Sequence, residues 1–374
     1  MFYFIHDFGS QICSFPSLIP ENNPLKPENI TDLRYAYRTD GKRGYIFVNN
    51  YVRKKNMSEH KEIKLPFPNS NEYFPPTTIH SGEYFFNPFN MDCGNIKIIS
   101  ADCSPLCILS DGTVVFYSRE FSDKKSGFFQ ISKDSKENEL SSSKFLVISR
   151  KNALNAWKLS DNKLIISENS IIQEPEGEII INGRGECSFL IYPDFENVPS
   201  IFKKCGKKNM NIATDLTPIE FTAYYVEKQI IPPVENSIIF SEKNKTKEKK
   251  IYHIDLSLLI KDFMTKKANS SLIDCFINIF YEGESARLYT ECENKKILIA
   301  DNFFSGKEYD WEIGLKRFID SRIDFSNLEL EIFSLSPKEK IYFEKPIDFK
   351  NEEYICNLNS IKAQWEWSQK ISMN

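Results

Sequence analysis

The stretch that decides the fold is Tyr281–Phe318, YEGESARLYTECENKKILIADNFFSGKEYDWEIGLKRF. Two runs of β-forming residues, Ala286–Thr290 and Lys296–Ala300, are joined by the charged segment Glu291–Lys295, which predicts a β-hairpin. Short strands separated by turns are typical of a β-sandwich that displays loops at one end. The stretch contains no nucleophile–base pair, metal-ligand cluster or glycine-rich phosphate loop. It therefore predicts recognition or scaffolding rather than catalysis.

The rest of the chain has the same β character. The 374 residues are enough for two or three domains, and 30 Phe and 17 Tyr favour strands over helices. Only Leu256–Lys267 and Ile313–Ser321 show a helical pattern, and strands do not alternate with helices at the spacing of a β/α barrel. We expect an all-β fold of two or three β-sandwich or jelly-roll domains.

Proline spacing and polar runs suggest how the chain divides. Four prolines between Pro16 and Pro27 indicate an extended connector, and the charge run Ser241–Lys250 is expected to be an exposed loop. The predicted parts are a connector at 1–30, a first β-sandwich at 31–120, a second β-rich segment at 121–210 that could belong to the first, and a jelly-roll domain at 211–374.

Composition narrows the function classes. The net charge is −4 with both signs dispersed, so nucleic acid is not expected as a partner. No apolar run is long enough to span a membrane, and the N-terminus lacks the features of a secretory signal, so a cytoplasmic protein is expected. The nine cysteines form no C-x-x-C motif and the four histidines are far apart, so we expect reduced thiols, no metal site and no cofactor.

Paired carboxylates are the first candidates for chemistry, because glycoside hydrolysis needs two of them about 5 to 9.5 Å apart. Glu329 and Glu331 lie two residues apart on a predicted strand, roughly 7 Å by strand rise. The apolar residues between them take the inner face, so both glutamates are expected to point to water. Glu282 and Glu284 flank a turn glycine. None of the four is assigned a catalytic role.

Aromatic residues are the candidates for binding. Trp311, Trp365 and Trp367 could stack on sugar rings, although the alternation of Ile361–Ser368 places the last two on a buried strand face. Tyr84–Asp92 is unusually aromatic. Either it is an exposed apolar patch that needs cover, or it is an ordinary sandwich core with a bulge.

The candidate residues for contact with a carbohydrate or with another domain share an aromatic or polar side chain in or near these stretches. They are Tyr84, Phe86, Phe89, Asn90, Asp92 and Trp311. Cys103 and Cys107 could ligate a metal only with further ligands, and buried free thiols are the favoured interpretation.

Four segments, in the same order along the chain, resemble the bacterial family 35 glycoside hydrolases, the β-galactosidase family. They are FIHDFGSQ at Phe4–Gln11, LRYAYRTDGKRGYIFVNNYVR at Leu33–Arg53, the aromatic segment Ile79–Cys107 with FNM at Phe89–Met91, and RLY, DNF and WEIGLKRF within Tyr281–Phe318. The resemblance is to the non-catalytic C-terminal β-domains. The family's β/α barrel, whose strands carry the two catalytic glutamates, would precede Phe4.

The resemblance implies a β-galactosidase-like protein represented by its accessory domains, inactive alone and supporting a barrel supplied by a separate or upstream-encoded polypeptide. The resemblance also implies galactosides as ligands and a galactose-binding-like last domain. It makes the barrel the domain that the candidate contact residues, Tyr84 to Asp92 and Trp311, would meet. Two alternatives stay open: a stand-alone carbohydrate-binding or scaffolding β-sandwich protein, and an enzyme whose site the sequence does not show.

Overall fold

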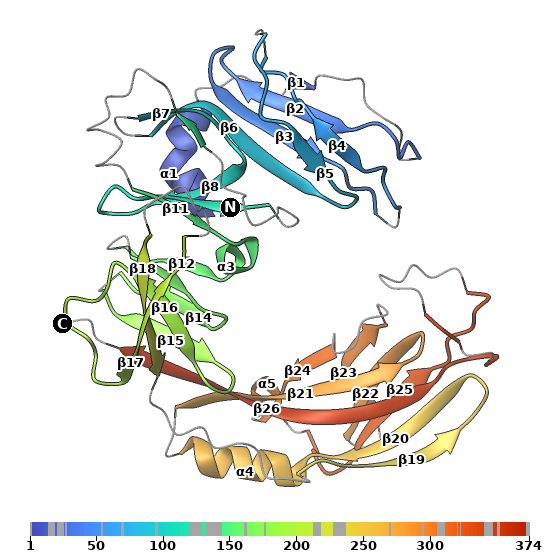
Figure 1. Cartoon of the computed structure of the whole chain (residues 1–374). Coiled ribbons are helices and arrows are strands. Elements are labelled where there is room, and N and C mark those ends of the chain that lie inside the picture. Colours follow the sequence, from blue (N-terminus) through green and yellow to red (C-terminus); the bar gives the residue numbers. More distant parts are fainter. Residues whose placement is uncertain are drawn as a thin grey trace. The chain divides into compact units, whose positions relative to one another are not determined.

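A computed structural model gives the fold of the chain (Figure 1). The residues that it describes are 2–13, 19–20, 26, 28–53, 55–68, 71–93, 96–119, 129–131, 144–160, 163–175, 177–211, 218–226, 237–268, 271–292, 295–304, 311–319, 321, 323–339, 347–349 and 352–371. Strands dominate these residues and almost all ladders are antiparallel, which confirms the predicted all-β, multi-sandwich fold.

The chain divides into two compact units. The first unit contains Met1–Gly177, Ser188–Glu227 and the last two residues, and the second contains Glu178–Cys187 and Lys228–Ser372. The division after Glu227 is later than the predicted start of the last domain at residue 211, and a ten-residue segment from the middle of the chain belongs to the second unit. Local sequence periodicity predicts neither this boundary nor the assignment of the ten-residue segment to the second unit.

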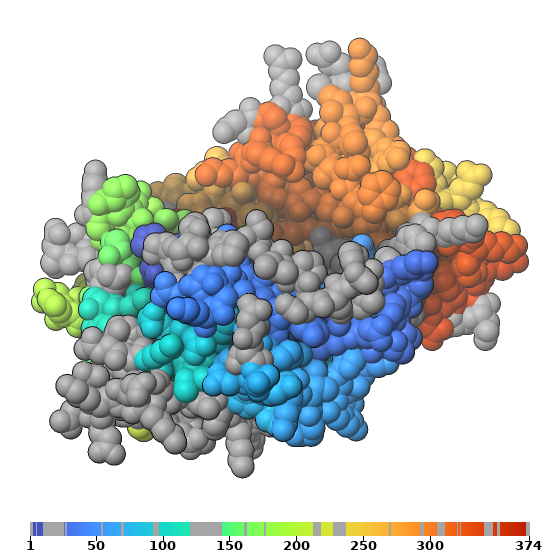
Figure 2. Space-filling model, turned by 90° about the horizontal axis from the view of Figure 1, so that it is seen from above, coloured from blue at the N-terminus to red at the C-terminus, as the bar shows by residue number. Residues whose placement is uncertain are grey.

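The first unit begins with a six-stranded sheet in the order β1-β2-β3-β6-β7-β10. Its strands are β1 (Ile19–Pro20), β2 (Arg34–Thr39), β3 (Gly44–Asn49), β6 (Tyr84–Cys93), β7 (Ile96–Ala101) and β10 (Phe129–Ile131). One face carries Tyr37, Ile46 and Phe89 and is covered by the segment with the short hairpin β4 (His60–Ile63) and β5 (Thr77–Ile79). In Figure 2 the atoms of this part are coloured from blue to cyan.

Helix α1 (Phe2–Cys13) packs on the other face of this sheet, against β8 (Figure 1). The sequence prediction of an irregular connector over 1–30 is wrong for these residues. Phe4 and Phe8, one helical turn apart, are 6% and 5% exposed and pack with Tyr45 and Phe116. The helix forms because this apolar stripe is buried between two sheets, not because its residues are strong helix formers.

Two further sheets complete the first unit. One has the order β11-β9-β8, with β8 (Cys103–Ile108), β9 (Val114–Ser118) and β11 (Phe145–Ile148), and β11 is parallel to β9. The other has the order β12-β13-β16-β18-β17, with β12 (Ala156–Lys158), β13 (Leu164–Ile166), β16 (Ser188–Tyr192), β17 (Phe202–Asn209) and β18 (Glu220–Val226). Their facing sides share one apolar core, and the unit also includes α3 (Arg150–Leu154) and β14 (Ser170–Gln173).

The second unit is a two-sheet sandwich. To one sheet the unit contributes four strands in the order β15-β26-β21-β24, with β15 (Ile179–Gly183), β21 (Leu272–Glu282), β24 (Trp311–Gly314) and β26 (Asn357–Ile371). The facing sheet has the order β19-β20-β25-β22-β23, with β19 (Ile239–Lys245), β20 (Lys249–Asp255), β22 (Ser285–Cys292), β23 (Lys295–Phe303) and β25 (Leu328–Phe333). The core between them includes Ile277, Leu288 and Leu330, each 0% exposed.

Local predictions for this unit have mixed outcomes. The hairpin in Tyr281–Phe318 is confirmed as β22 and β23. The helix predicted over Leu256–Lys267 is confirmed as α4 (Ser257–Lys267), whereas only α5 (Lys316–Ile319) of the second predicted helix is helical. The predicted exposure of Ser241–Lys250 is confirmed for most of its residues, but the prediction of a loop is wrong, because most of the segment lies in the paired strands β19 and β20.

No helix among the described residues is both long and apolar enough to cross a membrane.

Candidate binding site

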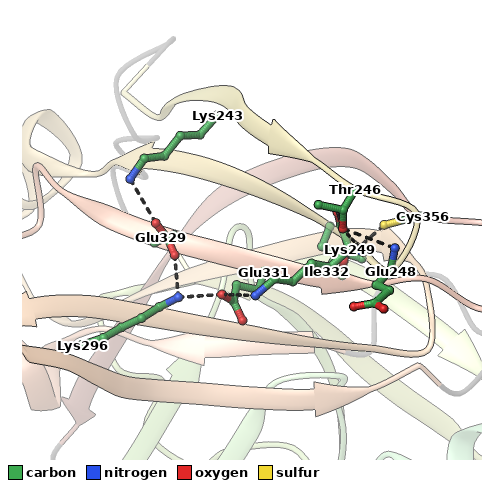
Figure 3. Close-up of polar contacts among 9 residues, drawn as sticks. All are labelled: Lys243, Thr246, Glu248, Lys249, Lys296, Glu329, Glu331, Ile332 and Cys356. Atoms are coloured by element: carbon green, nitrogen blue, oxygen red, sulfur yellow. Dashed lines mark hydrogen bonds and ion pairs between the residues drawn. The ribbon is translucent and has the colours of Figure 1, made fainter.

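Two glutamates lie on β25, on the face of its sheet that is turned away from the apolar core (Figure 3). The alternation of the strand produces this arrangement, since Leu328, Leu330 and Ile332 take the core face and are at most 1% exposed. Strands β19, β20 and β23 of the same sheet then place Lys243, Lys249 and Lys296 around Glu329 and Glu331. The result is a charged cluster of five side chains from four strands.

Lys296 is shared by both glutamates (Figure 3). Its Nζ donates to Glu329 Oε1 at 2.5 Å and to Glu331 Oε1 at 2.6 Å. Lys243 Nζ donates to the second oxygen of Glu329 at 3.1 Å, and Lys249 Nζ donates to Glu331 at 2.8 Å. Each glutamate therefore has two lysine partners, and the cluster carries one net positive charge.

The prediction that both glutamates form a solvated strand face is wrong for Glu331, which is only 5% exposed. Burial by itself raises the pKa of a carboxyl, but here the hydrogen bonds and charges of the lysines prevail. The pKa values of Glu329 and Glu331 are both lowered, and the same contacts raise the pKa of Lys296. Both glutamates are ionised at neutral pH.

This ionisation decides what the pair can do. Because one lysine nitrogen contacts both, the two oxygens are no more than about 5 Å apart, a spacing that resembles a retaining glycosidase. That mechanism also needs one carboxyl to hold a proton as the general acid. Neither Glu329 nor Glu331 is placed to hold a proton, because both are paired with lysines. The structure therefore agrees with the sequence analysis in assigning them no catalytic role.

A pocket of about 1000 Å³ opens in the same unit, where β25 ends. Phe333 at the end of β25 lines it together with Tyr354 and Phe349. Glu284, in the turn between β21 and β22, lines it as well, and its backbone N–H donates to the carbonyl of Phe333 at 2.9 Å. The pocket is within the size range of small-ligand sites.

The pocket is strongly acidic. Six of its lining residues are Asp or Glu and two are Lys. The pair between Lys247 and Glu353, at 3.3 Å, joins side chains that are 77% and 80% exposed, so it neutralises little of this charge. Aromatic rings and carboxylates thus share one concave surface, which suits ligands with apolar faces and several hydroxyl or cationic groups.

The aromatic stretch of β6 is mostly core. Phe89 is 1% exposed and packs with Tyr37 on one sheet face, while Phe86 packs on the other face with its ring centroid 4.9 Å from that of Phe4. Tyr84 alone of the predicted aromatic contact residues is well exposed, at 51%. Its ring forms an edge contact with Tyr51, and the Arg150 guanidinium lies 4.8 Å from its centroid.

Asn90 and Asp92 have structural partners. Asn90 has a φ of +49°, and its side-chain amide donates to the Lys42 carbonyl at 2.8 Å. This left-handed residue reverses the strand's alternation, so that Phe89 and Met91 pack on opposite faces. Asp92 accepts a 2.7 Å hydrogen bond from Arg43 across the hairpin.

The tryptophans considered for sugar stacking are core residues. Trp311, Trp365 and Trp367 are 4%, 4% and 2% exposed. The predicted alternation of β26 is confirmed, with the latter two on its buried face. A buried indole cannot offer a face to a sugar, so Trp311 is placed in the core of the second unit and not in its pocket.

The two cysteines considered as metal ligands are buried free thiols, as the sequence analysis favoured. Cys103 and Cys107 are both 0% exposed and free, and burial raises the pKa of Cys107 to about 12. In the part of the chain that the structure describes, no three Asp, Glu, His or Cys side chains are grouped as metal ligands would be.

Sequence reasoning missed the pocket. Its lining residues Glu248, Glu284, Phe333 and Tyr354 are up to about a hundred positions apart, and no local motif connects them. The sequence pattern presents Glu284 only as a possible carboxylate pair with Glu282. The available signal was the turn glycine between these two glutamates, which marks a loop at one end of the sandwich.

No protein-family model matches the chain, and no curated protein matches it. The resemblance to family 35 glycoside hydrolases stays a prediction.

Proposed function

We propose that this chain is a non-catalytic β-sandwich protein that binds carbohydrate through the pocket of its second unit. The observation that carries the proposal is the meeting of Phe333, Tyr354 and carboxylates such as Glu284 on one concave surface of about 1000 Å³. Aromatic rings pack on the apolar faces of sugars, and carboxylates accept hydrogen bonds from their hydroxyl groups. The lysine-bound state of Glu329 and Glu331 favours binding over hydrolysis.

A second candidate function follows from the resemblance: the chain serves as the accessory β-domains of a family 35-like β-galactosidase whose barrel is a separate or upstream-encoded polypeptide. The exposed pair Tyr51 and Tyr84, 47% and 51% exposed, favours it. Two neighbouring tyrosines with Arg150 over one ring form a surface of the kind enriched at protein interfaces. In this second candidate function the chain acts in the cytoplasm, and its ligands are galactosides.

Calorimetric titration of the whole chain with galactose, lactose and a set of neutral and amino oligosaccharides tests the first proposal. We expect saturable binding of at least one sugar, weakened about tenfold or more by Tyr354→Ala or Glu284→Gln, since each removes a pocket contact. Tyr84→Ala is the matched control and should leave this binding unchanged. Absence of binding, or equal loss in all three variants, would contradict the pocket assignment.

Hydrolysis of a chromogenic β-galactoside separates the two candidates. Neither requires activity from the chain alone. Activity that appears only when a barrel polypeptide is added, and that falls with Tyr84→Ala but not with Tyr354→Ala, would support the accessory role. Hydrolysis by the purified chain alone would refute both candidates.

A further inference from the structure

Strand β23 is the outer strand of the five-stranded sheet, where it pairs only with β22. In Figure 1 it lies at the end of this sheet opposite β19. Its sequence is KKILIADNF, and Ile297, Leu298 and Phe303 are 47%, 48% and 74% exposed. Its outer backbone N–H and C=O groups, with apolar side chains beside them, form an edge that can accept another strand.

Among the described residues, the edge strands β17 and β19 carry more charge along their middle than β23 does. Edge strand β19 continues from Phe240 into SEKNK, which places Glu242 and two lysines along it. Edge strand β17, FKKCGKKN, carries four lysines. Charges at these positions oppose edge-to-edge pairing, because they would be desolvated or brought next to like charges. The middle of β23, Ile297–Ala300, has no charge over four residues.

We propose that two copies of this chain pair antiparallel through β23, with Leu298 at the two-fold axis. In this register Lys295 lies opposite Asp301 of the partner subunit, Ile297 lies opposite the partner's Ile299, and Leu298 meets its own copy. Lys295 and Asp301 are both exposed on β23, so their side chains are accessible for the contact. Opposite charges at the two ends and apolar residues between them make the strand complementary to itself.

Antiparallel self-pairing produces a closed dimer. Each subunit contributes the edge of its own β23, so the interface is isologous. Once the two edges are paired, neither can accept a further strand. The remaining edge of the sheet is the charged strand β19, which stops further addition. A bulge leaves Ile299 without a partner on β22 and raises the local twist of β23.

Cysteine crosslinking tests the register in a Cys205→Ser background, because Cys205 is an exposed free thiol. Leu298→Cys should give a disulfide-linked dimer on mild oxidation, since residues facing across an antiparallel ladder are about 5 Å apart at Cα. Lys295→Cys is the matched control. The proposed register separates its two copies by six residues, or roughly 20 Å, so this variant should not crosslink above background.

Sedimentation equilibrium of the disulfide-free chain provides the second measurement. We expect a reversible dimer between about 1 and about 200 µM, abolished by Leu298→Lys and retained by Ile239→Lys on the opposite edge. Equal crosslinking of the two cysteine variants would overturn the proposal. So would a wild-type monomer with no crosslink at residue 298, or a dimer that survives Leu298→Lys.

Discussion

Replacing Lys296 by Met tests the electrostatic account of the charged cluster most directly. Lys296 donates to both glutamates, at 2.5 and 2.6 Å, and is 41% exposed. Hydrogen bonds to charged groups contribute about 1.5–3 kcal/mol each when buried, and exposure of the lysine reduces this through solvent screening. Because Glu329 and Glu331 each keep one lysine partner, we expect the free energy of unfolding to fall by about 1–2 kcal/mol at neutral pH.

The pH dependence has a defined sign. The pKa values of both glutamates are lowered in the folded state, so the unfolded chain binds more protons as the pH falls. The stability they contribute is fully present above the ordinary glutamate pKa of 4.5 and is lost as the pH falls through the folded pKa values. The difference between wild type and Lys296→Met should therefore be largest at neutral pH and should shrink below the ordinary value.

Urea unfolding followed by tryptophan fluorescence measures the loss of unfolding free energy caused by Lys296→Met, with both proteins in a Trp157→Phe background. The remaining tryptophans, Trp311, Trp365 and Trp367, all belong to the second unit, so the emission reports on the unit that contains the cluster. Lys247→Met is the matched control, because its 77% exposed side chain pairs with an equally exposed glutamate and should contribute almost nothing. A Lys296→Met effect no larger than this control, or one that does not change with pH, would refute the reasoning.

Three other outcomes follow from buried groups. Asp7→Asn should destabilise the first unit by about 3 kcal/mol, because it leaves Lys158, 8% exposed, without its carboxylate, and circular dichroism during urea unfolding would detect the loss. Trp311→Ala should cost about 3–5 kcal/mol as a cavity in the second unit, and a smaller cost measured by the same method would contradict its core position. At about pH 8, iodoacetamide should modify Cys205 and spare Cys107, which mass spectrometry of the native chain would show.

Several features could be predicted from the sequence because they depend on neighbouring residues. The alternation of apolar and polar side chains predicted the strands, the β22–β23 hairpin and the buried face of β26 that contains Trp365. It also predicted that Glu329 and Glu331 lie opposite the core face of β25, since a strand sends successive side chains to opposite sides.

The tertiary structure alone decided what each face contacts. Phe4 and Phe8 are helical because two sheets close over them, and Glu331 is buried because lysines from neighbouring strands cover its outward face. The pocket exists because Glu284, Phe333 and Tyr354 converge where the sandwich ends. Local periodicity reports the direction of a side chain but not the partner that it meets, and burial, ionisation and concavity depend on that partner.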